Sequence, residues 1–163
     1  MDNITSEINE QDFETLKSKY GLKWHKFLIY FALWAFALSY FSSGYKLING
    51  AHYEGDAPYI YAVYPALKST DLVAGILLIL LGAAAIYVRF QLADFKKGAI
   101  GKLTKLYIAD IVIGTIYVIA FFAIVRQNPF DSISDFVGSI IGSVIAMIIN
   151  ISYYRNRDEL FIN

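Results

Sequence analysis

The sequence predicts an all-α polytopic membrane protein, a four-transmembrane-helix bundle with both chain ends in the cytoplasm. Its 163 residues are 57% hydrophobic and only 17% charged, with a mean hydropathy of +0.48. This composition is too apolar for a soluble domain of this length. The apolar residues also form four stretches, each long enough for a helix to cross a hydrocarbon core of ~30 Å. The positive charges, finally, gather on one side of these stretches.

The four predicted spans cover residues 27–43, 72–89, 106–125 and 134–153. Nearly every position in them is Ala, Leu, Ile, Val, Phe, Tyr, Gly or Ser. Because lipid cannot satisfy free backbone N–H and C=O groups, each stretch is expected to be helical. A β-barrel would need alternating polar and apolar residues, and a soluble helical core would need a charged face on each helix. The sequence shows neither pattern.

Lysine and arginine residues set the predicted orientation, because short loops rich in them stay in the cytoplasm. Of the 14 basic residues, only three fall on the outer side: Lys46, Lys68 and Arg126. The others flank the spans on the side of the chain ends: Lys17, Lys19, Lys23, Lys26, Arg89, Lys96, Lys97, Lys102, Lys105, Arg155 and Arg157. We therefore expect a multi-pass protein of the cell membrane with both termini cytoplasmic.

Two segments are expected in the cytoplasm, residues 1–23 and the tail 154–163. Over residues 6–20 acidic side chains precede lysines, which suits the dipole of a short helix. In the tail, Leu160 and Phe161 would return an apolar edge to the membrane, and a docking tail for a protein partner is the alternative. Since no linker or repeat divides the chain, residues 1–163 are expected to form one membrane domain.

The outer loop 44–69 is the only sizeable segment predicted on the opposite side. It is rich in tyrosine, so we expect a folded cap at headgroup level, interrupted by Pro58 and Pro65. Asp71 follows a Ser and a Thr at the start of a span, a pattern typical of helix capping. A cation site is the alternative role for the outer carboxylates of Glu54, Asp56, Asp71, Asp131 and Asp135. Because they form no recognisable ligand loop, we predict no metal site.

Small residues form one face of the fourth span, where Gly138, Gly142 and Ala146 recur at intervals of four. Such faces allow two helix backbones to approach closely. The interpretation that we favour is packing within the chain's own bundle, and a dimer interface is the alternative. A similar face lies on the second span at Gly75, Gly82 and Ala85.

Asp110 is the only carboxylate well inside a predicted span. It follows Lys105 by ~7 Å along the helix, so we place it close to the cytoplasmic boundary. Arg89, Tyr30 and Asn150 are predicted at the same level and would form a polar cluster with it. We favour a structural ion pair with Arg89, and proton or cation binding is the alternative.

The sequence offers little for catalysis. It has no cysteine, and its two histidines, His25 and His52, are far apart, which excludes thiolate chemistry and the usual zinc spacings. Signatures of nucleotide binding and of Ser/His hydrolysis are missing as well. The net charge is zero and the charges lie in short clusters between long apolar runs, so no basic face is available for nucleic acid. We therefore predict no cofactor and no enzymatic activity, with His25 an interfacial anchor and His52 either a loop residue or part of the cap.

Three stretches resemble an uncharacterised family of small four-helix membrane proteins from Gram-positive bacteria. They are Tyr64–Lys68 followed by Asp71 and Gly75, Ala85–Ala93 followed by Phe95 and Lys96, and the tail Tyr153–Phe161. The resemblance runs from about Trp24 onward. It implies the same four-helix membrane fold, and it implies no activity, because that family has none established.

Two functions remain open from the sequence. The first is a non-enzymatic integral membrane protein that lies in the lipid bilayer. It would act through helix or loop contacts with a second copy of itself or with an unidentified membrane protein. The second is a small oligomeric transporter or channel for protons or cations that uses Asp110. Four helices leave little room for a water-filled path in one monomer, so transport would require assembly.

Overall fold

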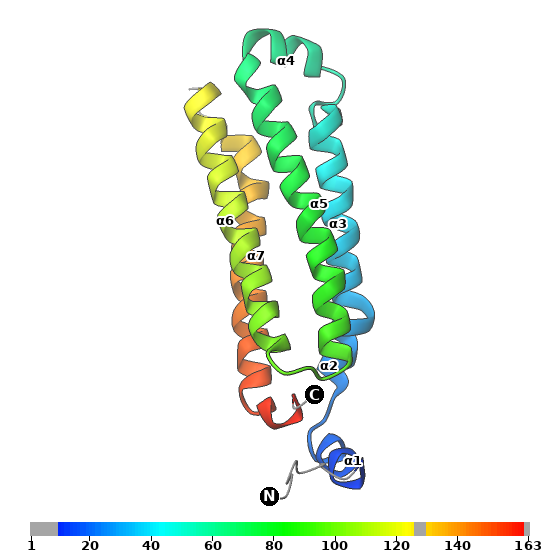
Figure 1. Cartoon of the computed structure of the whole chain (residues 1–163). Helices are drawn as coiled ribbons and strands as arrows, with labels where there is room; N and C mark the ends of the chain where they lie inside the picture. Colours follow the sequence, from blue (N-terminus) through cyan, green and yellow to red (C-terminus); the bar gives the residue numbers. More distant parts are fainter. Residues whose placement is uncertain (1–9, 126–129, 162–163) are drawn as a thin grey trace, which may run out of the picture.

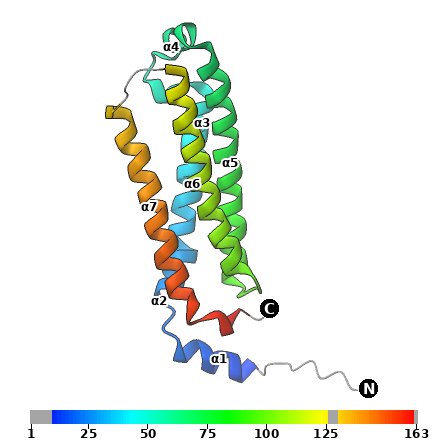
Figure 2. The ribbon, with the colours of Figure 1, turned by 90° about the vertical axis from the view of Figure 1, so that its left-hand side faces the viewer.

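The computed structural model describes residues 10–125 and 130–161, and every regular element in these ranges is helical (Figures 1 and 2). In chain order the elements are α1 Glu10–Lys19, α2 Lys23–Phe27, the π-helical turn η1 Leu28–Ala32, α3 Leu33–Asn49, the 3-10 turn η2 Ala51–Tyr53, α4 Ala57–Val63, α5 Pro65–Ala93, α6 Ala99–Val125, α7 Phe130–Arg155 and the 3-10 turn η3 Asp158–Leu160.

Three helical runs are long and apolar enough to cross a membrane: Lys23–Asn49, Pro65–Ala93 and Ala99–Val125. At 27 to 29 residues they measure about 40 Å, more than the hydrocarbon core requires. They contain the predicted spans 27–43, 72–89 and 106–125. The predicted span 134–153 lies within α7, whose apolar part in the described residues is Ile140–Arg155. The all-helical class is therefore confirmed, with three membrane-length helices.

The long helices stand side by side, with α3 packed on α5, α5 on α6 and α6 on α7 (Figure 1). Both chain ends lie at one end of the bundle and α4 lies at the other. A close approach joins α3 to α5 at Gly44 and Gly75. A Cβ on either glycine would lie 2.7 Å from the other's carbonyl oxygen, so the two backbones touch. The small-residue face of the second predicted span, at Gly75, thus makes a tight helix contact.

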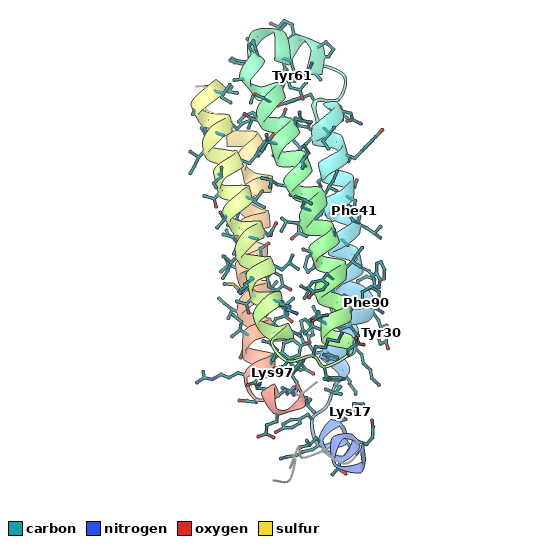
Figure 3. The ribbon with its side chains drawn as sticks, viewed as in Figure 1. Lys17, Tyr30, Phe41, Tyr61, Phe90 and Lys97 are labelled. Carbon is teal, nitrogen blue, oxygen red and sulfur yellow. The ribbon has the colours of Figure 1, made fainter. Side chains whose placement is uncertain are left out.

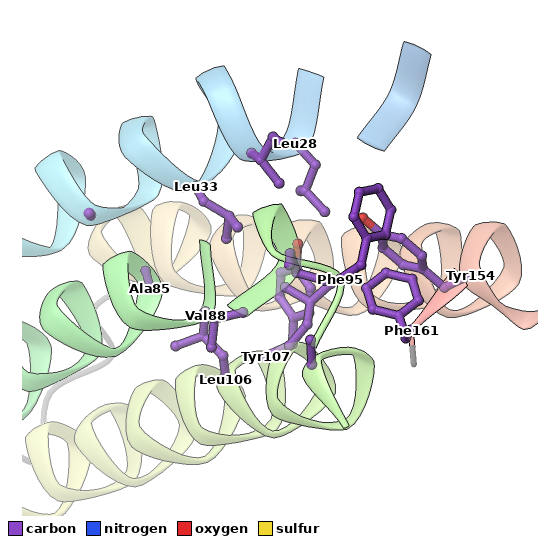
Figure 4. Packing of buried hydrophobic residues seen from close by; sticks show 14 of the residues in the cluster. Leu28, Leu33, Ala85, Val88, Phe95, Leu106, Tyr107, Tyr154 and Phe161 are labelled. Atoms are coloured by element: carbon purple, nitrogen blue, oxygen red, sulfur yellow. The ribbon is translucent and has the colours of Figure 1, made fainter. Parts of the chain in front are cut away.

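The largest buried cluster lies toward the end with the chain termini (Figure 4). Leu28 and Leu33 meet Leu92 and Leu103 there, all at most 1% exposed. The C-terminal turn joins the same cluster, since Leu160 is 0% and Phe161 5% exposed. The expectation that Leu160 and Phe161 return to the membrane is wrong, because they pack inside the protein.

The outer segment is more helical than a loop over residues 44–69. Helix α3 continues to Asn49 and ends at Gly50, which adopts φ +75°, a left-handed conformation that glycine tolerates best. Helix α5 already begins at Pro65, because proline has the φ of a first helical residue and needs no N–H partner there. The connection therefore shrinks to residues 50–64, which contain η2 and α4.

Candidate functional site: two aspartates and the cavity between them

Asp71 is fully buried in the second turn of α5, beneath the cap that η2 and α4 form. Its carboxylate accepts three tyrosine hydroxyl groups. Tyr53 and Tyr61 donate to Oδ2 at 3.0 Å each, and Tyr117 donates to Oδ1 at 2.8 Å. An ionised carboxylate can only accept, so three hydroxyl donors match its bonding capacity well. The Asp71 cluster ties η2, α4 and α6 to α5.

His52 completes the Asp71 cluster. Its Nε2 lies 3.6 Å from Oδ2 of Asp71, and its ring lies 3.7 Å from that of Tyr53. The sequence left His52 as either a loop residue or part of the cap, and the structure places it within the cap. The capping role expected for Asp71 is wrong, because α5 starts six residues earlier at Pro65.

Burial and the Asp71 carboxylate shift the titration of the cap tyrosines. Loss of solvent raises the pKa of Tyr61 from 10.0 to about 12, and its hydrogen bond to Asp71 adds to the effect. The pKa of Tyr53 is raised for the same reasons, again with desolvation first. Both hydroxyl groups therefore stay protonated donors at physiological pH.

A cavity of about 330 Å³ lies between the Asp71 cluster and Asp110. Helix α6 lines it with Asp110, Gly114 and Tyr117, which share one helical face. The facing residues come from α3, α5, α7 and η2: Ser39, Tyr40, Ser43, Lys46, Leu47, Leu78, Ile140 and His52. Tyr117 and His52 belong to both the Asp71 cluster and the cavity wall, so the two features are continuous.

Asp110 lies about 16 Å along α6 from Ala99, near the middle of a helix of 27 residues. Its Oδ2 accepts the hydroxyl of Ser143 from α7 at 2.5 Å, and Tyr40 of α3 faces the same carboxylate. The carboxylate is only partly buried, because one side opens to the cavity.

The expected ion pair between Asp110 and Arg89 does not form. Arg89 points to η1, where its Nε donates to the carbonyl oxygen of Ile29 at 3.1 Å. Neither residue takes part in the ion pairs Lys17–Glu14, Lys96–Asp94 and His52–Asp71 of the described part of the chain. Arg89 lies about 6 Å along α5 from its end at Ala93, whereas Asp110 lies about 16 Å along α6 from its start, and the two side chains have different neighbours.

The other members of the predicted cluster also separate. Asn150 is 3% exposed; it accepts from Trp24 Nε1 at 3.0 Å and donates to the Tyr107 hydroxyl at 3.0 Å. These contacts close the bundle between Asp110 and the end with the chain termini. Tyr30 is 66% exposed and lies beside Arg89, away from Asp110.

The predicted packing face of α7 is open. Gly138 and Gly142 are exposed, and a Cβ added at either would meet nothing within 4 Å. Only Ala146 packs against the core cluster. The interpretation that we favoured, packing in the chain's own bundle, is therefore wrong for these two glycines. Contact with another helix stays a prediction.

Sequence reasoning missed two features at the end of the bundle where α2 meets α7. His25, expected as an interfacial anchor, is 2% exposed, with Nδ1 at 2.8 Å from the Tyr154 hydroxyl and its ring stacked on Phe95. The polar link from Trp24 to Asn150 was also unforeseen. No local pattern marks either feature, because both join residues more than 120 positions apart.

The outer acidic residues do not gather into a metal site in the described residues. Glu54 and Asp56 are exposed, whereas Asp71 is buried among tyrosines. The side chains of Asp131 and Asp135 lie outside the part that the structure describes.

Comparison with known proteins adds no assignment, because no protein-family model, curated protein or solved structure matches the chain. The resemblance to small Gram-positive membrane proteins remains an expectation from the sequence.

Proposed function

We propose that this chain is a four-span, non-enzymatic protein of the cell membrane, with both termini cytoplasmic, that binds a small cation or a proton at Asp110. One observation carries the proposal: a mid-helix carboxylate opens into a cavity that several hydroxyl-bearing residues line, and it has only neutral hydroxyl partners among the described residues. A carboxylate at this depth in a membrane is costly unless a positive charge or water compensates it. A bound cation or a proton supplies that compensation.

The cavity supports an oxygen-rich site. Hydroxyl groups of Ser39, Ser43 and Tyr40 line it with the Asp110 carboxylate, and hard cations prefer such oxygen ligands. Lys46 also lines the cavity, about 9 Å along α3 from Tyr40 and exposed, so its ammonium belongs to the outer end. The cavity thus connects the outer cap with Asp110.

Assembly is part of the proposal for transport. Trp24, Asn150 and Tyr107 close the inner end of the bundle by hydrogen bonds. A continuous path would therefore need these contacts to open, or a second copy to supply the inner half. Binding at Asp110 needs neither.

The experiment is ion flux into liposomes that contain the purified protein, with a pH-sensitive dye for protons and sodium and potassium gradients in separate runs. Asp110→Asn should abolish flux at unchanged thermal stability, and Glu54→Gln, an exposed outer carboxylate, should leave it intact. If no ion moves, cation-dependent thermal stabilisation of the wild type but not of Asp110→Asn would still support binding. Identical behaviour of the two proteins in both assays would refute the proposal.

The orientation rests on the distribution of basic residues and has its own test. Reporter fusions after Asn163 and within residues 94–102 should report the cytoplasm, and a fusion at Gly55 should report the outside. A cytoplasmic Gly55 would reverse the assignment.

A second function, action through contacts between helices, is favoured by the open glycines of α7. Gly138 and Gly142 leave room for another backbone against this helix. The occupant would be a second copy or another membrane protein. This function is compatible with a cation site at Asp110, because Ser143 and Gly142 lie on different faces of α7.

A further inference from the structure

Arg89 lies near the end of α5 on the side of the chain termini, and the backbone of the neighbouring helix fixes its position. Its Nε donates to the carbonyl oxygen of Ile29 at 3.1 Å. Ile29 belongs to the π-helical turn η1, where the regular helical hydrogen-bond ladder is interrupted. Turns of this kind are rare and often occur at functional sites.

Three aromatic rings surround the guanidinium of Arg89. Its Cζ lies 4.6 Å from the ring centre of Phe90, 5.6 Å from that of Trp34 and 5.9 Å from that of Tyr30. The three rings are themselves 48%, 39% and 66% exposed, so they face the membrane. Figure 3 shows Tyr30 and Phe90 together near this end of the bundle. Tyr and Trp rings favour the headgroup level, which places the guanidinium there.

The terminal amino groups of Arg89 are left for a ligand. Within the described residues the guanidinium donates only through Nε, although it carries five N–H donors in a planar fork. That fork matches two oxygens of a phosphate group. Lys26, exposed one turn before Tyr30, adds a second positive charge on this side.

We propose that Arg89, framed by Tyr30, Trp34 and Phe90, binds the phosphate of an anionic phospholipid. The aromatic rings would contact the upper acyl chain and glycerol, while the two Nη groups and Lys26 meet the headgroup oxygens. A free phosphate ion has the same acceptor chemistry, but it would leave the exposed rings uncovered. The site is independent of Asp110, which faces α7 and the cavity.

The test is native mass spectrometry of the purified protein in mild detergent, titrated with phosphatidylglycerol and with phosphatidylcholine of the same acyl chains. Phosphatidylglycerol should bind more tightly. Arg89→Ala should weaken its binding on the order of tenfold, as expected for the loss of a charge-assisted two-point contact. Arg155→Ala removes an exposed basic residue from the same end and should leave the binding unchanged.

Because Arg89 also links α5 to η1, Arg89→Ala could lower affinity by disturbing the fold, and a second variant separates the two effects. Tyr30→Ser leaves the bond to Ile29 intact and should weaken binding about threefold at an unchanged melting temperature, the size of an exposed cation–π contact. Equal affinity for the two lipids, or equal losses in Arg89→Ala and Arg155→Ala, would overturn the proposal. Displacement of the lipid by millimolar inorganic phosphate would overturn it too, because the site would then bind the free ion.

Discussion

Tyr117 donates its hydroxyl proton to the buried carboxylate of Asp71 at 2.8 Å, and this bond joins α6 to the outer end of α5. Tyr53 and Tyr61 bring the connection between α3 and α5 to the same carboxylate. Because Tyr117 also lines the cavity above Asp110, the stability of the cap and the shape of the cavity depend on one side chain.

Loss of the Tyr117 hydroxyl should therefore destabilise the outer end. Tyr117→Phe removes one donor to a buried carboxylate, and a hydrogen bond to a charged group contributes about 1.5–3 kcal/mol. The free energy of unfolding in detergent should fall by that amount. Tyr45→Phe, which removes an exposed hydroxyl from α3, is the matched control and should change nothing. Equal stability of the two variants would mean that Asp71 does not depend on this bond.

Alkaline pH should loosen the cap in a defined window. Burial raises the pKa of Tyr61 to about 12, whereas an unfolded tyrosine titrates at 10.0. The stabilising effect of a raised pKa is fully present below the unfolded value and is lost as the pH rises through the folded one. Stability should therefore fall between about pH 10 and 12.

The measurement is thermal unfolding across that range, with tyrosinate absorbance recorded in parallel. Tyr61→Phe should make the melting temperature depend less steeply on pH, because it removes a tyrosine whose pKa is raised by folding. Tyr59 lies on the same helix but is 74% exposed, so Tyr59→Phe should keep the wild-type dependence of the melting temperature on pH. Identical pH profiles for the two variants would contradict the assignment.

The helices could be predicted from the sequence because a span needs about 20 apolar residues, and stretches of that length stand out in the sequence. The ends of the helices could not. The segment from Pro65 to Asp71 is polar, and its Ser-Thr-Asp pattern is typical of an N-cap. The structure instead starts α5 at Pro65, and proline at a first helical position was the signal available for it.

The pairing of Arg89 with Asp110 failed for two reasons. The sequence did not give the ends of α5 and α6, so it placed the two residues at the same level, and it does not give the direction in which each helix faces. Arg89 faces η1 and Asp110 faces Ser143 and the cavity. The rotation of each helix follows from contacts such as Gly44 against Gly75, which one sequence does not disclose.

The open face of α7 predicts an effect on assembly without an effect on the fold. Gly142→Leu places a branched side chain where nothing lies within 4 Å in the monomer, so the melting temperature of the monomer should hold. If a second helix covers this face, the oligomer mass in mild detergent should drop to that of the monomer. Gly101→Leu, an equally open glycine on α6, is the control and should keep the wild-type mass. An unchanged mass in Gly142→Leu would show that this face meets lipid.

The last prediction concerns water in the cavity, and the chain suits it because it contains no cysteine. Single cysteines can be introduced without background labelling. Ser43→Cys lies on the cavity wall contributed by α3, and Ile119→Cys is 62% exposed on α6 and should face lipid.

A membrane-impermeant thiol reagent added outside intact cells should label Ser43→Cys and should leave Ile119→Cys unlabelled, because thiols react as thiolates and thiolates need water. A small cation bound at Asp110 should slow labelling of Ser43→Cys by occupying the cavity, and Asp110→Asn should remove this protection. Labelling of both cysteines at equal rates would mean that the outer half of the bundle is open to solvent on all sides. Labelling of Ser43→Cys only after the cells are broken would place the cavity on the cytoplasmic side and reverse the proposed orientation.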